Sequence, residues 1–178
     1  MTNARNLARL IVDSGGAIPS GSMPAGSVIQ VVQSVKTDSQ STTSTSFVDV
    51  SDLSVQITPQ NASNKILVKV ALNNIGQNSN SIVGFNLLRN GSQVISNTSG
   101  GFADTNNAWV FAGGANHSAP SRQLNSAFLD YLDSPSSTSN LTYKIQMKVS
   151  GGTGSLNRWA LNTDNGAVST ITLMEIAG

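Results

Sequence analysis

The sequence predicts an all-β protein, a jelly-roll-like antiparallel β-sandwich with an extended N-terminal arm. Three observations indicate this fold class. About ten short segments of the 178-residue chain carry apolar residues at the spacing of strands, turns rich in Gly, Ser, Asn and Pro separate them, and no helical pattern follows residue 12. Many short strands without intervening helices are typical of sandwiches and jelly rolls rather than of α/β folds.

The N-terminal 26 residues are expected to form an arm. A helical pattern covers "NARNLARLIV" at residues 3–12, which is shorter than the roughly 12–15 residues that an isolated helix needs in water. Its anchoring side chains are the apolar Leu7, Leu10 and Ile11 and the basic Arg5 and Arg9. The glycines and prolines of "DSGGAIPSGSMPAG" exclude helix and strand and indicate a linker. We therefore expect an arm over 1–26, ordered only against another surface, and a β domain over 27–178.

Strands are expected in the β domain wherever the apolar period is two or an apolar run is short. The expected ranges are 27–35, 46–59, 65–73, 82–89, 92–96, 107–113, 122–132, 141–149, 155–159 and 167–176. The dipeptide Asn90-Gly91 predicts a tight hairpin between two of them. The Ser/Thr/Asn-rich segments 37–46 and 97–107 are expected to be loops.

Two of these strands carry further information. In 141–149, Leu141, Tyr143, Ile145, Met147 and Val149 alternate with polar residues, which is typical of an antiparallel strand with one buried face. The last strand is apolar on both faces. That pattern predicts a central place in a sheet, or one face packed against another subunit.

Composition argues against several classes of protein. Ten basic and nine acidic residues give a net charge of +1 without any basic run, so no nucleic-acid surface is expected. No apolar stretch is long enough for a membrane span or a signal peptide. Cysteine is absent, which excludes disulfides, thiolate nucleophiles and Cys-based metal sites.

Residues with catalytic chemistry are also sparse, so we expect no enzyme, no cofactor and no metal. The single histidine, His117, lies in "GGANHSAPS", and no G-x-S-x-G elbow accompanies it. The carboxylates stand mostly in turns. One segment, "LNRWALNTDNG", combines residue types that stack on and hydrogen-bond to sugars, so Trp159, Arg158 and Asn162 are candidate glycan contacts. A core or interface role for the tryptophan is the alternative.

Several stretches resemble a known family. They are "STSFVDVSDLSVQITPQNASNKILVKVAL", "YLDSPSSTSNLTYKIQMKVSG" and "GAVSTITLMEI". They resemble small virion structural proteins of tailed bacteriophages of the marine and cyanobacterial (cyanophage) type, usually labelled tail-fibre-like. The opening "ARNLARLIVDSGG" is similar to the N-terminal adaptor of such proteins. The resemblance covers nearly all of residues 40–178 and implies a jelly-roll-like domain that forms trimers and has no catalytic residues.

The chain lacks the repetitive shaft of a long tail fibre. We therefore expect a cement, decoration or short head-fibre protein of the virion, located on the capsid exterior. It would form a homotrimer and bind the major capsid protein or another virion protein through Arg5, Leu7, Arg9, Leu10 and Ile11. The alternative is a tail-located, receptor-binding knob that contacts host surface glycans. Its contact loops would be 74–81, 97–107, 113–121 and 150–155.

Overall fold

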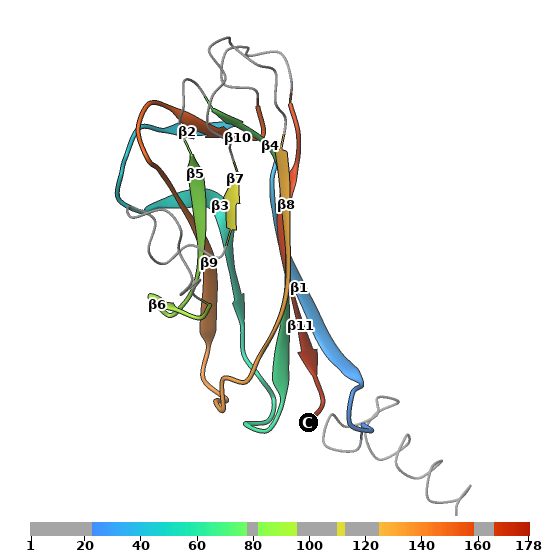
Figure 1. Cartoon of the computed structure of the whole chain (residues 1–178). Coiled ribbons are helices and arrows are strands. Elements are labelled where there is room, and N and C mark those ends of the chain that lie inside the picture. Colours follow the sequence, from blue (N-terminus) through green and yellow to red (C-terminus); the bar gives the residue numbers. More distant parts are fainter. Residues whose placement is uncertain (1–22, 78–81, 96–109, 113–124, 159–165) are drawn as a thin grey trace, which may run out of the picture.

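The chain folds into two facing antiparallel sheets (Figure 1). The structure, a computed structural model, describes residues 23–77, 82–95, 110–112, 125–158 and 166–178. Its strands are β1 (Val28–Lys36), β2 (Gln40–Thr42), β3 (Val48–Ile57), β4 (Lys65–Gln77), β5 (Val83–Arg89), β6 (Ser92–Gln93), β7 (Val110–Ala112), β8 (Asn125–Asp133), β9 (Leu141–Val149), β10 (Gly154–Leu156) and β11 (Ser169–Ile176). The predicted all-β class is confirmed.

The order of the strands within the sheets is that of a jelly roll. One sheet runs β1-β11-β4, and both β8 and β10 pair with the other side of β4. The second sheet runs β3-β9-β5, with β6 and β7 on the far side of β5. We now set aside the short β2, β6 and β10 and renumber the eight remaining strands 1 to 8 in chain order. The two sheets then have the strand orders 1-8-3-6 and 2-7-4-5. Two four-stranded sheets that exchange strands in this way form the double Greek key of a jelly roll.

The core lies between the sheets and follows the predicted alternation. Every second residue of β9 from Leu141 to Val149 is buried, as expected for a strand with one buried face. In β4 the alternate residues Ile66, Val68, Val70 and Leu72 are buried. Because successive side chains of a strand point to opposite faces, the sequence period alone places these residues inside.

The alternation in β3 contains one break, and the backbone accommodates it. Buried Val50 and Leu53 are three positions apart, whereas Leu53, Val55 and Ile57 are two apart. The pairing with β9 shifts between Asp49 and Ser54, and Asp52 has a φ of 60°. This bulge-like irregularity turns both halves of the strand toward the core.

The predicted hairpin after β5 is present. Asn90 and Gly91 have φ values of 50° and 83°, and two positive φ angles are what a type I′ turn requires. The turn is also held from the side, because the Thr142 N–H donates to Asn90 Oδ1 at 2.8 Å. The strand that follows is shorter than the predicted 92–96, since β6 ends at Gln93.

Two predicted loops are in part strands. The segment 37–46 was expected to be a loop, but Gln40–Thr42 forms β2 and pairs with β10. Backbone groups make this ladder, so polar side chains do not prevent it. Residues 74–77 were also expected in a loop, but β4 continues to Gln77. A positive φ of 47° at Asn74 marks the irregularity through which the strand continues.

The last strand has the central position that its sequence predicts, between β1 and β4. Only one of its faces is buried within the described chain. Residues 169, 171, 173 and 175 are buried, whereas Thr170, Thr172, Met174 and Ile176 are only half-buried. The outward half of its apolar pattern therefore faces away from the core.

Gly154 allows β10 to lie close to the core. A Cβ at this position would lie 2.6 Å from a methyl group of Val149 and 2.7 Å from one of Val83. At the opposite end of the sandwich, the Gly26 N–H donates to the Ala177 carbonyl at 2.8 Å. The segment before β1 therefore leaves the domain beside the C-terminus (Figure 1).

Candidate interaction surface

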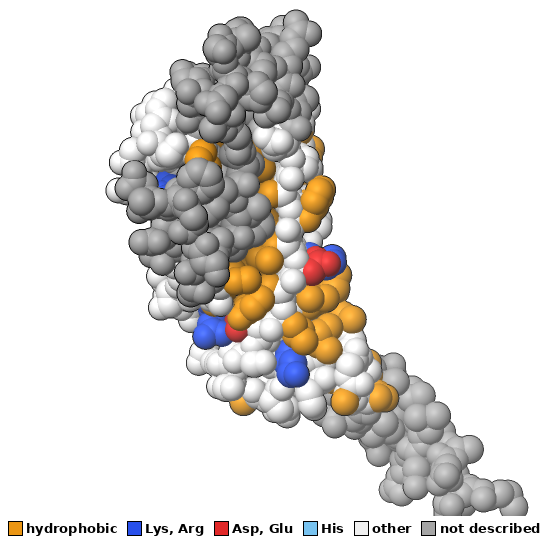
Figure 2. Space-filling model, in the orientation of Figure 1, with side chains coloured by type: hydrophobic (Ala, Val, Ile, Leu, Met, Phe, Trp, Pro, Cys, Tyr) orange, Lys and Arg blue, Asp and Glu red, His pale blue; other side chains and the backbone are white. Residues whose placement is uncertain are grey.

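The exposed large hydrophobic side chains of the described residues gather on one side of the molecule. They are Val28, Val31, Val35, Phe128, Leu132 and Val168. Three belong to β1, two to β8, and Val168 directly precedes β11. Figure 2 shows hydrophobic side chains around a small charged cluster on the side of the molecule that carries β8. Single exposed hydrophobic residues are ordinary, but a contiguous group of them marks an interaction site.

Strand register arranges these residues in rows across the sheet. One row is Val31, Met174, Leu67 and Leu132, and another is Val35, Thr170, Ala71 and Phe128. Phe128 is 69% exposed and Leu132 is 49% exposed. We call the outward side chains of β1, β11, β4 and β8 the outer face. Only tertiary pairing brings its members together, because they come from distant parts of the chain.

A polar row separates the two apolar rows of the outer face. Gln33 Nε2 donates to Thr172 Oγ1 at 2.7 Å, and Lys69 Nζ donates to Asp130 Oδ1 at 2.7 Å. This row therefore carries no net charge, and each of these groups already has a partner. A shallow depression over this part of the face is lined by Lys69, Val70, Ala71, Phe128, Asp130, Thr170 and Thr172.

The outward side of the second sheet is different in character. Lys144 Nζ and Gln146 Nε2, both on β9, donate to the two carboxylate oxygens of Asp49 at 2.7 Å. The hydrogen bond from Lys144, followed by that from Gln146, holds the pKa of Asp49 below its ordinary value. None of the exposed large hydrophobic residues named above belongs to this sheet. The contrast identifies the outer face of the first sheet as the candidate interaction surface.

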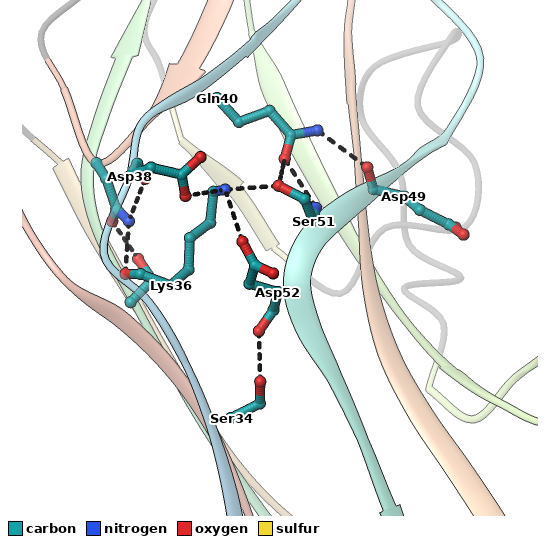
Figure 3. Close-up of polar contacts among 9 residues, drawn as sticks. Ser34, Lys36, Asp38, Gln40, Asp49, Ser51 and Asp52 are labelled. Carbon is teal, nitrogen blue, oxygen red and sulfur yellow. Dashed lines mark hydrogen bonds and ion pairs between the residues drawn. The ribbon is translucent and has the colours of Figure 1, made fainter.

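A buried lysine forms the centre of a polar cluster between β1 and β3 (Figure 3). The Lys36 side chain is fully buried, and its Nζ donates to Asp38 Oδ1 at 2.6 Å and to Ser51 Oγ at 2.7 Å. Asp52 Oδ2 lies 4.0 Å away. The hydrogen bond from Lys36 lowers the pKa of Asp38. The ion pair with Asp38 and the hydrogen bond to Ser51 give the buried ammonium group of Lys36 the partners that burial requires.

Amide side chains extend this cluster to neighbouring strands. Gln40 Oε1 accepts the Ser51 N–H at 2.8 Å, and Gln40 Nε2 donates to the Asp49 carbonyl at 2.9 Å. Asn157 Nδ2 donates to the carbonyls of Lys36 and Asp38 at 2.9 and 3.0 Å. The cluster therefore fastens the β1–β2 connection to β3 and to the residue after β10.

A second polar cluster joins the two sheets through the core. Asp133, at the end of β8, accepts from Arg89 Nη1 and from the Tyr143 hydroxyl, each at 2.6 Å. Arg89 and Tyr143 belong to the other sheet. Burial, and then the hydrogen bond to Asp133, raises the pKa of Tyr143 well above its ordinary value. The hydroxyl therefore stays protonated and remains a donor to Asp133.

A third carboxylate, Glu175 on β11, is fully buried and anchors the turn between β3 and β4. Its oxygens accept from the Gln60 N–H at 2.7 Å, from Asn64 Nδ2 at 2.6 Å and from Gln30 Nε2. A buried charge is costly unless it is hydrogen-bonded, and three donors meet that need here. These polar clusters therefore maintain the sandwich.

The residues that the sequence singled out lie mostly outside the described part of the chain. This holds for Arg5, Leu7, Arg9, Leu10 and Ile11, for Trp159 and Asn162, and for His117. Arg158 is described: its Nε atom is buried without a hydrogen-bond partner among the described residues, and its carbonyl accepts from Ser155 Oγ at 3.1 Å. The roles predicted for the arm and for the glycan contacts stay predictions.

The loops proposed for host contact are described only in part. Of these ranges, 78–81, 97–107 and 113–121 lie outside the described residues. Residues 74–77 belong to β4 and 154–155 to β10, so their assignment to loops was wrong. Their backbone groups pair within the sheet and are not free for a ligand.

Two general findings concern metals and membranes. Within the described ranges, no group of three or more His, Cys, Asp and Glu side chains is placed to hold a metal ion. The same part of the chain contains no helix with the length and hydropathy needed to span a bilayer.

Comparison with known proteins yields structural neighbours. No protein-family model matches the chain, and no curated protein matches it. A structure of infectious bursal disease virus strain Gx is 14% identical with a TM-score of 0.45, covering 86% of this chain and 33% of that one. The D431N mutant VP2 protein of the same virus, in T=1 particles, is 15% identical with a TM-score of 0.42, covering 83% and 36%. The chain spans about a third of the length of these structures.

Proposed function

We propose that this protein is a virion structural protein: a jelly-roll head that forms homotrimers and attaches to a viral capsid through residues 1–26. It would act as a cement, decoration or short head-fibre protein of a tailed bacteriophage of the marine or cyanobacterial type. The observation that carries the proposal is the outer face. The sandwich buries an apolar core between its sheets, yet the described residues leave two rows of one sheet's outward side chains uncovered. A contiguous exposed apolar patch of this kind is typical of a surface that binds another protein.

The pairing of charged groups in the described part of the chain supports a structural role in the virion. The charged groups within the sandwich are paired for stability, as Lys36 with Asp38 and Arg89 with Asp133. The double Greek key requires neither disulfides nor metals, and the chain has no cysteine.

The place where the described chain enters β1 supports attachment at one end of the head. Residues before β1 leave the sandwich at a point held by the Gly26–Ala177 hydrogen bond. Three arms from one trimer would bind together, and linked weak contacts produce slow dissociation. In this proposal Leu7, Leu10 and Ile11 supply apolar contact, and Arg5 and Arg9 meet acidic groups of the shell.

The alternative, a glycan-binding knob, has less support. Of its three proposed contact residues only Arg158 is described, and the Nε of that guanidinium is buried. A sugar would need donors that face solvent. No described observation favours this alternative over capsid attachment.

Virion incorporation tests the proposal. The full chain with Leu7→Asp, Leu10→Asp and Ile11→Asp should fold normally but should no longer co-sediment with purified virions. The matched control carries Ser14→Asp, Ser20→Asp and Ser22→Asp in the adjoining linker, which adds the same charge and should leave incorporation unchanged. Wild-type incorporation of the first variant would contradict docking through the arm. Absence of the wild-type chain from purified virions would contradict the virion role itself.

A further inference from the structure

We propose that the outer face is the surface through which copies of this chain bind one another, with a threefold axis parallel to the strands and beside β8. This inference rests on the homotrimer proposed above and assigns its contact surface. The occupant of the face is therefore a second copy of this chain.

The size and composition of the face suit the centre of such an interface. Four strands at about 4.8 Å spacing and eight residues at about 3.3 Å give roughly 500 Å² in projection. The largest apolar patch of a typical monomer is about 300–600 Å², and such patches are often functional. A standard interface hides about 800 Å² per partner, with an apolar centre and a polar rim. The outer face supplies the centre, and surrounding polar residues such as Lys65 supply the rim.

The charge pattern of the face matches that of another copy. The polar row presents Lys69 and Asp130 side by side, and both remain partly exposed, at 43% and 66%. Rotation about an axis parallel to the strands keeps equivalent residues of the three copies at the same level along that axis. Lys69 of one copy can then meet Asp130 of the next, so that the three pairs form a ring of alternating charge. A partner of one charge sign, such as nucleic acid, would meet one of these groups with repulsion.

The same symmetry brings apolar residues together above and below the charges. Phe128 from three copies meets at one level and Leu132 at another, because β8 carries both on the side nearest the axis. These two side chains are among the most exposed hydrophobic residues described. All copies then point in the same direction, so that the three arms leave the trimer at the same end.

The first test measures the oligomeric state of the full chain by native mass spectrometry and light scattering. The wild type should be a trimer, and Phe128→Asp or Leu132→Asp should weaken association at least tenfold while circular dichroism stays unchanged. The control is Gln56→Asp, an exposed position of β3 on the other sheet, which should remain trimeric. A monomeric wild type at micromolar concentration overturns the inference, as does a trimer that these two substitutions leave intact.

The second test uses the absence of cysteine from the chain. The single substitution Phe128→Cys should yield intermolecular crosslinks with a short bis-maleimide, whereas Gln56→Cys should yield none. Equal crosslinking at the two positions overturns the assignment of the face. A trimer that is absent from virions would refute the proposed function and leave this inference standing. A monomer that enters virions would overturn this inference and the proposed homotrimer, and would leave the virion role standing.

Discussion

Replacing Asp133 tests how strongly one buried carboxylate holds the two sheets together. Asp133 comes from β8, whereas its two donors, Arg89 and Tyr143, come from β5 and β9 of the opposite sheet. The Asp133→Ala change removes both hydrogen bonds at once. It leaves the Tyr143 hydroxyl buried without its acceptor and Arg89 without its counter-charge.

The expected loss is about 3 kcal/mol of unfolding free energy. Removing one partner of a buried ion pair costs about 3–5 kcal/mol. We take the lower end because the Arg89 side chain is 30% exposed and can turn toward water. The orphaned hydroxyl alone accounts for about 1–3 kcal/mol. A net stability of about 5–15 kcal/mol makes such a loss easy to detect.

Urea unfolding at fixed protein concentration provides the measurement, since association would otherwise alter the apparent stability. Asp49→Ala is the matched control, because its exposed ion pair should contribute only about 0–1 kcal/mol. A double-mutant cycle with Tyr143→Phe should show coupling of about 1 kcal/mol, because the phenylalanine removes the orphaned hydroxyl. A loss below about 1 kcal/mol for Asp133→Ala, or strict additivity in the cycle, would refute the reasoning.

Three further changes have defined outcomes. Gly154→Ala should cost about 1–3 kcal/mol in thermal unfolding, because its new methyl group would overlap two buried valine side chains; Gly151→Ala has open space around its Cβ and should be near neutral, and equal effects would contradict the packing. Gly91→Ala should destabilise the Asn-Gly hairpin by about 1 kcal/mol, because alanine is strained at a φ of 83°; an unchanged melting temperature would argue against the turn type. Because hydrogen bonds from Lys144 and Gln146 depress the pKa of Asp49, its contribution to stability is present above its ordinary value of 3.8 and is lost as the pH falls through the lowered value. Asp49→Asn should therefore flatten the acid limb of a stability–pH curve, and an unchanged limb would contradict this.

Local pattern predicted some elements and missed others for identifiable reasons. The strand 141–149 was predicted residue by residue because its alternation is uninterrupted. The Asn90-Gly91 turn was predicted because few residues adopt two positive φ angles. The β2 strand was missed because Gln40, Ser41 and Thr42 carry no apolar signal, and only their ladder with β10 defines them.

The sequence predicted the candidate surface only in part. Apolar residues on both faces of the last strand already indicated a central strand or contact with another subunit. The outward residues Leu67 and Ala71 of β4 and Phe128 and Leu132 of β8 carried the same signal. No pattern within one strand could show that they form two continuous rows.

The sequence by itself determined most of the segments that form strands and which of their side chains turn inward, because side-chain direction along an extended backbone alternates within each strand. Only the tertiary structure decided which strands are neighbours and in what register, since those pairings join residues far apart in the chain. It therefore also decided that Lys36 is buried against Asp38, that Asp133 joins the sheets, and that scattered valines, a leucine and a phenylalanine form one face. The physical reason is that burial and register are properties of paired strands, and one strand alone contains neither.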